Sequence, residues 1–141
     1  MNSYLPMITK NSLVPKNIFL WIASAWTLAM AVVCLVTFEE LPGMNLQNSD
    51  KFGHIMMHFL FSLFWFFHFR TANRELRSAM IAGMVLGLSI FYGIMIELAQ
   101  KFFTSTRNAD LGDVLANFAG AFSALILLLV YSYYSRKPKY N

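Results

Sequence analysis

Four long apolar runs alternate with short polar stretches along the chain. The runs cover residues 18–38, 52–69, 79–99 and 114–134. At ~1.5 Å rise per residue, a helix over each run reaches about 27 to 32 Å, which matches a hydrocarbon core of about 30 Å. In hydrocarbon the hydrogen-bonding groups of the backbone are all paired only in a helix or a closed barrel. The runs lack the alternation of apolar and polar residues that is typical of barrel strands. The pattern therefore predicts an all-α, polytopic membrane protein, a bundle of four transmembrane helices.

Composition agrees with a membrane protein, because 57% of the 141 residues are hydrophobic and 13% are charged. The runs leave little chain over for another domain, so we expect a single membrane domain over residues 1–141. The first run resembles a signal peptide in that Lys10 and Lys16 precede it. It is longer than an ordinary signal core, and the VTFEELPG that follows offers no small-x-small cleavage site. We interpret it as an uncleaved span.

The distribution of Lys and Arg predicts the orientation. Eight of the eleven cations fall on one side of the predicted bundle: Lys10, Lys16, Arg70, Arg74, Arg77, Arg136, Lys137 and Lys139. Lys and Arg are retained preferentially on the cytoplasmic side, so both the N and the C termini should be cytoplasmic. Topology then accounts for the formal charge of +4. No basic element suited to a nucleic-acid groove accompanies that charge, so no nucleic-acid partner is expected.

Polar side chains enter the outer ends of three of the predicted helices. In the second helix, Asp50, His54 and His58 recur every four residues. Glu97 and Gln100 are three residues apart in the third helix, and the spacings between Asp110, Asp113 and Asn117 at the fourth are three and four. Each group therefore lies on one helix face. Ionisable residues within a membrane usually face the bundle interior, a partner or a water-filled cavity. The sequence therefore predicts one outward-facing polar pocket. Its expected ligand-binding residues are Asp50, Lys51, His54, Glu97, Gln100, Arg107, Asp110, Asp113 and Asn117.

Structural alternatives exist for most of these residues. Asp113 is placed to complement the positive end of a helix dipole, and Asp110 to turn the preceding loop. Asn117 suits a hydrogen bond between helices, and Arg107 can snorkel to the interface. His54 and His58 form HxxxH, which supplies only two ligands, so no metal site and no cofactor are expected.

Small residues predict where helices approach one another. Gly83 and Gly87 form GxxxG in the third run, and Ala116, Gly120 and Ala124 form a small-residue ridge in the fourth. Both patterns are typical of close helix packing in membranes. We expect both to lie at helix interfaces.

Taken in order, the blocks DKxxH, ExxQ and RxxDxxDxxxNxxG resemble the VanZ-like family of small bacterial membrane proteins. The resemblance runs from Asp50 to Ala124, with His58 where an aromatic residue is common and Ala124 where a second glycine is usual. It implies a multi-pass protein of the bacterial cytoplasmic (inner) membrane and a role at the cell envelope. The family's namesake is associated with low-level resistance to teicoplanin. The resemblance supplies a location and a motif set, and it supplies no reaction.

Three hypotheses for the function follow. In the first, the pocket binds an anionic membrane lipid, a lipid-linked cell-wall precursor or a lipophilic glycopeptide. In the second, the protein is an intramembrane hydrolase or transferase with His54 or Glu97 as general base. In the third, the charged residues only hold the helices together. No nucleophile elbow or activated serine accompanies the histidines, which disfavours the enzyme. Transport is disfavoured because the inner ends of the runs carry no matching polar set.

Overall fold

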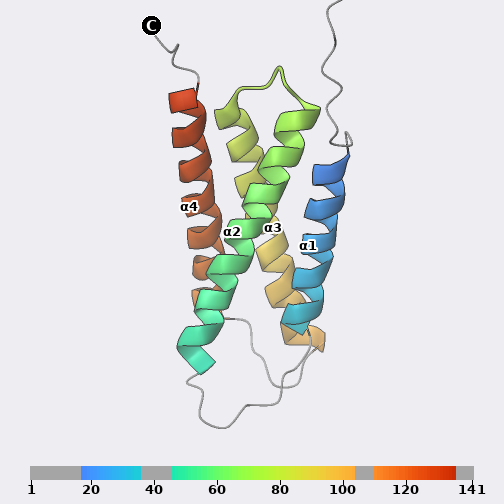
Figure 1. Cartoon of the computed structure of the whole chain (residues 1–141). Coiled ribbons are helices and arrows are strands. Elements are labelled where there is room, and N and C mark those ends of the chain that lie inside the picture. Colours follow the sequence, from blue (N-terminus) through green and yellow to red (C-terminus); the bar gives the residue numbers. More distant parts are fainter. Residues whose placement is uncertain (1–16, 36–45, 104–109, 136–141) are drawn as a thin grey trace, which may run out of the picture.

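The computed structural model describes residues 17–35, 46–103 and 110–135. These residues form four helices, α1 (Ile18–Leu35), α2 (Leu46–Ala72), α3 (Ser78–Phe103) and α4 (Leu111–Ser135), shown in Figure 1. Each helix is long and apolar enough to cross a membrane. The prediction of an all-α, multi-pass membrane protein is confirmed. Residues 36–38, at the end of the first predicted span, lie outside the described residues.

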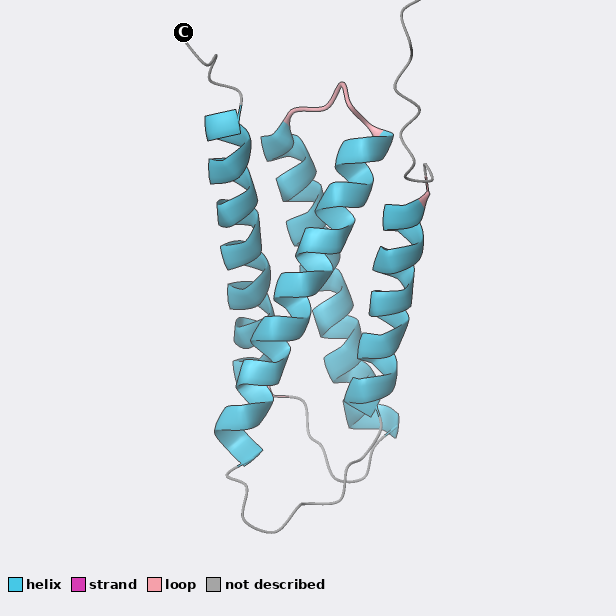
Figure 2. Ribbon diagram, viewed as in Figure 1, coloured by secondary structure: helices cyan, strands magenta, loops and turns pink. Residues whose placement is uncertain are grey.

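The four helices run alternately up and down. Figure 2 shows the short loop between α2 and α3 at one end of the bundle, the end where α1 begins and α4 ends. At the opposite end α1 and α3 finish while α2 and α4 start. Because the polar residues of the sequence sit at the start of α2, the end of α3 and the start of α4, this connectivity brings them to the same end.

Helix α2 is the centre of the bundle and makes its most extensive interface with α4. Small residues of α4 allow this approach, since Ala116, Gly120 and Ala124 are all buried. A side chain on Gly120 would overlap the backbone carbonyl of Ile55 on α2. The small-residue ridge predicted for the fourth helix is therefore confirmed as a packing surface.

The apolar core occupies the half of the bundle nearer the α2–α3 loop. Its buried members come from α2, α3 and α4, and are Phe66, Ile81, Ala82, Val85, Leu125 and Leu128. Helix α1 is more peripheral, contacting α2 and α3 within the described part of the chain. Two hydrogen bonds also attach α1 to its neighbours. The Trp26 indole donates to the Met57 carbonyl, and the Tyr92 hydroxyl donates to the Thr27 carbonyl at a distance of 2.6 Å.

The GxxxG prediction for α3 is wrong. Gly83 and Gly87 are exposed, and a Cβ added to either would meet no atom of the described chain within 4 Å. The buried face of α3 instead carries Val85, Ser89 and Gly93. Hydropathy cannot separate these faces, because lipid and protein interior are equally apolar and an outward face need not be polar.

Candidate functional site

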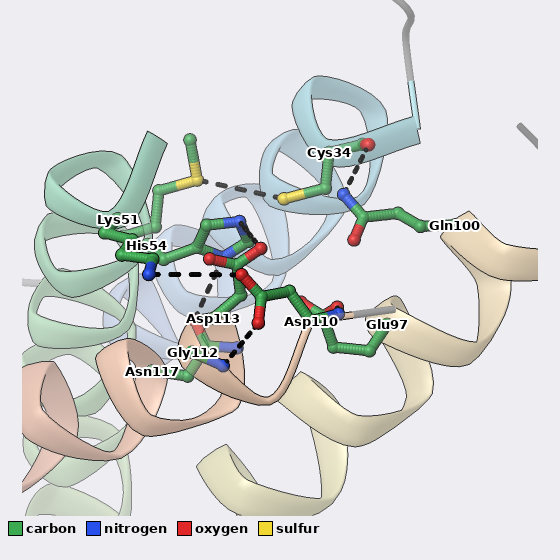
Figure 3. A network of polar contacts seen from close by, with 10 residues as sticks. Cys34, Lys51, His54, Glu97, Gln100, Asp110, Gly112, Asp113 and Asn117 are labelled. Atoms are coloured by element: carbon green, nitrogen blue, oxygen red, sulfur yellow. Dashed lines mark hydrogen bonds and ion pairs between the residues drawn. The ribbon is translucent and has the colours of Figure 1, made fainter. Parts of the chain in front are cut away.

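The polar residues of three helices meet at the end of the bundle opposite the α2–α3 loop (Figure 3). Helix α2 supplies its first turns, α3 its last two turns, and α4 its start together with the residue before it. We call this group the polar cluster. Its members are Asp50, Lys51, His54, Glu97, Asp110, Asp113 and Asn117. The expected convergence of three segments on one level is what the structure has, although the binding role expected of these residues stays a prediction.

His54 lies at the centre of the polar cluster and is almost fully buried. Its Nδ1 is 3.1 Å from Oδ1 of Asn117, and an amide oxygen only accepts hydrogen bonds, so Nδ1 donates. Its other nitrogen, Nε2, is 3.9 Å from Oδ2 of Asp113. Both partners belong to α4, so the histidine connects the first turns of α2 to those of α4.

Asp110 fixes the start of α4. Its Oδ1 accepts a hydrogen bond from the Gly112 amide at 2.8 Å, and its own amide donates to Oε2 of Glu97 at 3.2 Å. Asp110 is thus the N-terminal capping residue of α4, whereas its structural alternative in the sequence was a turn in the preceding loop. Lys51 Nζ is 4.0 Å from Oδ2 of Asp110, and its side chain is 43% exposed. A pair so open to solvent contributes little stability, which makes Lys51 a cation at the rim of the polar cluster.

Two atoms of the polar cluster are buried without a hydrogen-bond partner among the described residues. They are Oε1 of Glu97 and Nδ2 of Asn117, on side chains that are 3% and 2% exposed. A buried polar atom left unpaired costs about 1 to 3 kcal/mol. Two such atoms lie close together in the polar cluster, and a water, an ion or a ligand would complete their bonding.

Three residues of the sequence prediction lie apart from the polar cluster or cannot be placed. Gln100 points to α1, where its Nε2 donates to the carbonyl of Cys34 at 3.0 Å. His58 is one turn deeper than His54, with Nδ1 2.7 Å from the Ser89 hydroxyl, and packs on the ring of Tyr92. Arg107 lies outside the described residues.

The structure adds a crevice that the sequence did not reveal. It has a volume of about 190 Å³, lies between α3 and α4, and is lined by Ile90, Gly93, Val114, Leu115, Asn117 and Phe118. Ile90, Leu115 and Phe118 are exposed, so the crevice opens on the outer surface of the bundle. A Cβ on Gly93 would be 2.9 Å from Nδ2 of Asn117. The missing side chain at Gly93 therefore leaves room for the unpaired amide nitrogen of Asn117 beside the crevice.

Comparison with known proteins places the chain. Residues 4–132 match the VanZ/LLP1 family. The chain belongs to the VanZ/LLP1 family. This VanZ/LLP1 protein is 32% identical over 107 residues to the uncharacterized protein C11E3.10 of Schizosaccharomyces pombe, a stretch of 74% of this chain and 63% of that relative. The chain thus spans less than two thirds of the relative's length. No solved structure matches it.

Family membership confirms the resemblance seen in the sequence and leaves the source open. The relative comes from a yeast, so a VanZ/LLP1 sequence does not by itself place the protein in a bacterial membrane. The structure supports the coarser statement that this VanZ/LLP1 protein is a multi-pass membrane protein with four candidate spans.

The motif blocks of the VanZ/LLP1 chain divide into two kinds of residue. Asp50, His54, Glu97, Asp113 and Asn117 meet in the polar cluster. Two others connect neighbouring helices. The side-chain amide of Gln100 on α3 donates to a carbonyl of α1, and the backbone of Gly120 on α4 packs directly against Ile55 of α2. One linear motif thus encodes both a site and the packing that holds it.

Proposed function

We propose that this VanZ/LLP1 protein binds an anionic membrane lipid, with the headgroup at the polar cluster and an acyl chain in the crevice between α3 and α4. Asn117 carries the proposal because it belongs to both regions. Its Oδ1 accepts a hydrogen bond from His54 in the polar cluster, while its side chain also lines the crevice and its Nδ2 is buried without a partner among the described residues. A lipid has the same arrangement, with an apolar chain joined to a polar head through groups that accept hydrogen bonds.

The position of the crevice supports a lipid over a water-soluble ligand. Leu115 and Phe118 at its mouth are exposed on a helix that is long and apolar enough to span the membrane, so their surroundings are acyl chains. An ester carbonyl entering the crevice would accept the free hydrogen bond of Asn117. Lys51 at the rim offers a cation to the headgroup, and Arg107 lies three residues before Asp110 in the sequence.

Blocking the crevice tests the proposal without touching the polar cluster. Leu115→Trp fills the mouth of the crevice from α4, and Leu127→Trp places the same side chain on an exposed position of that helix away from it. We expect Leu115→Trp to lower retention of the bound lipid at least about tenfold, which is ~1.4 kcal/mol of binding free energy, and Leu127→Trp to leave it unchanged. The measurement is native mass spectrometry of protein extracted gently from its own membrane.

The same spectra decide between ligand classes. An anionic glycerolipid lost in Leu115→Trp supports the proposal. A retained lipid-linked cell-wall precursor or a lipophilic glycopeptide would replace the lipid by one of the other expected ligands, and would favour the resistance role of the family's namesake. Equal retention of ordinary lipids by both tryptophan variants would contradict a specific site and leave the polar cluster as a structural device.

The proposal places the polar cluster on the outer side of a bacterial cytoplasmic membrane, with both termini inside, because most cations lie on the other side. Cysteine labelling in intact cells tests this in a Cys34→Ser background. We expect a membrane-impermeant maleimide to label Lys51→Cys in intact cells and Arg74→Cys, in the α2–α3 loop, only after permeabilisation. The reverse pattern would put the polar cluster on the cytoplasmic side and overturn the orientation.

A further inference from the structure

Two residues of α2 and one of α4 form a group with the chemistry of a metal site. Asp50 and His54 are four positions apart on one face of α2, and Asp113 faces them from the first turn of α4. One ligand atom from each lies within 4.8 Å of the others. We propose that Asp50, His54 and Asp113 bind a divalent cation of the Mn²⁺ or Zn²⁺ type.

The orientation of His54 is the first reason. Its Nδ1 carries the proton that bonds to the amide oxygen of Asn117, so in the neutral form of the ring Nε2 presents a lone pair. That lone pair faces Oδ2 of Asp113 at 3.9 Å, a distance too long for a hydrogen bond. With the ring neutral, Nε2 and Oδ2 are two acceptors facing one another, an arrangement that a cation between them would stabilise. A histidine whose second nitrogen is fixed by an oxygen acceptor is also how proteins orient metal ligands.

The carboxylate of Asp113 is a second, independent reason. The residue is 9% exposed, and its side chain accepts no hydrogen bond from any described residue. Buried carboxylates are normally paired, hydrogen-bonded or coordinated to a metal. Asp113 is therefore a largely buried acid directed at the ligand atoms of α2, and its ion-pair partner there, when protonated, is the imidazole of His54.

The ligand set selects the class of ion. One imidazole and two carboxylates suit Mn²⁺, Zn²⁺ and related ions, and exclude the soft ions that prefer thiolates. Metal–ligand distances near 2.1 Å would draw the three atoms inward from their present separations. Three protein ligands leave coordination positions free for water or for an oxygen of a ligand.

The cation also accounts for the charge of the polar cluster. Among the described residues of the polar cluster, four acids (Asp50, Glu97, Asp110 and Asp113) and one lysine give a formal charge of −4 + 1 = −3 with His54 neutral. Such a group repels an anionic headgroup. A divalent ion with a free coordination position would attract a phosphate oxygen instead, and this role, unlike metal binding itself, rests on the proposed function.

Equilibrium binding of Mn²⁺ to the full-length protein tests the site. After removal of metals with EDTA, the protein in neutral detergent is titrated with Mn²⁺, and free Mn²⁺ is read from its electron paramagnetic resonance signal. We expect about one ion per chain, and at least a tenfold weaker affinity in His54→Ala and in the milder Asp50→Asn. His58→Gln is the matched control, since His58 is buried on the same helix but bonded to Ser89, and should bind as wild type. Absence of stoichiometric binding of both Mn²⁺ and Zn²⁺ by wild type, or unchanged binding in a folded Asp50→Asn, overturns the site.

Lipid retention measured with and without EDTA separates this inference from the proposed function. Loss of the anionic lipid on chelation, with recovery on adding Mn²⁺, supports the ion as the bridge to the headgroup. Retention of the lipid after chelation overturns the bridge and leaves lipid binding intact. Metal binding in a protein that retains no lipid overturns the proposed function and leaves the metal site intact.

Discussion

Replacing Gly120 by alanine is expected to lower the apparent melting temperature of the detergent-solubilised protein by roughly 5 °C or more. The added Cβ would overlap the carbonyl oxygen of Ile55 and lie 2.9 Å from its carbonyl carbon. These are backbone atoms inside a helix, so no side-chain rotation relieves the overlap and α2 must move away from α4. Overpacking of this kind costs about 1 to 3 kcal/mol, and a loss of that size produces a shift of several degrees.

Gly83→Ala provides the matched comparison. Gly83 is also within a long apolar helix, yet an added Cβ would meet no atom of the described chain. Alanine is the better helix former by roughly 0.5 to 1 kcal/mol, so this variant should melt at the wild-type temperature or above it. Thermal unfolding followed by circular dichroism measures both. If Gly120→Ala were as stable as Gly83→Ala, the close packing of α2 on α4 would be wrong.

The elements of the fold were predictable because the membrane sets strict conditions. A run of about twenty apolar residues has few alternatives to a helix, and short connections force neighbouring helices to alternate in direction. These two facts alone bring the start of α2, the end of α3 and the start of α4 to one end of the bundle. Spacings of three and four then place His54, Glu97 and Asn117 toward a common interior. The polar cluster follows from topology and periodicity.

What the sequence could not give is which apolar face packs and how individual side chains bond. Gly83 and Gly87 match a packing motif but face outward, whereas Gly93, which matches no motif, forms the floor of the crevice beside Asn117. Ser89 reads as an ordinary small residue within an apolar run, and only the crossing of α2 and α3 pairs it with His58. Such outcomes depend on side-chain directions and helix offsets, which hydropathy does not encode.

The largest functional effect is expected for Asp113→Asn, which removes a ligand of the proposed cation and should thereby abolish retention of the anionic lipid while making the protein more stable. Two terms oppose one another. The acid at the start of α4 gains about 0.3 to 1 kcal/mol from the helix dipole, which the amide loses. Against this, a largely buried carboxylate that accepts no hydrogen bond costs about 1 to 3 kcal/mol. The asparagine amide can replace the pairing of Asp113 with His54 by donating toward Nε2 of the neutral ring. The burial term is larger, so we expect a rise of a few degrees in melting temperature.

The sign of that change separates a binding site from a structural one. If the charges of the polar cluster exist to hold α2 and α4 together, Asp113→Asn must lower the melting temperature, because it removes one partner of the pair with His54. If the charges exist to bind a ligand, they lower the stability of the ligand-free protein. Neutralising one of them then raises the stability while ligand binding is lost. Glu75→Gln, on the exposed α2–α3 loop, is the control and should change neither property. Melting and lipid retention measured on the same preparations give the answer, since a destabilised variant that still retains the lipid contradicts the proposed role of Asp113.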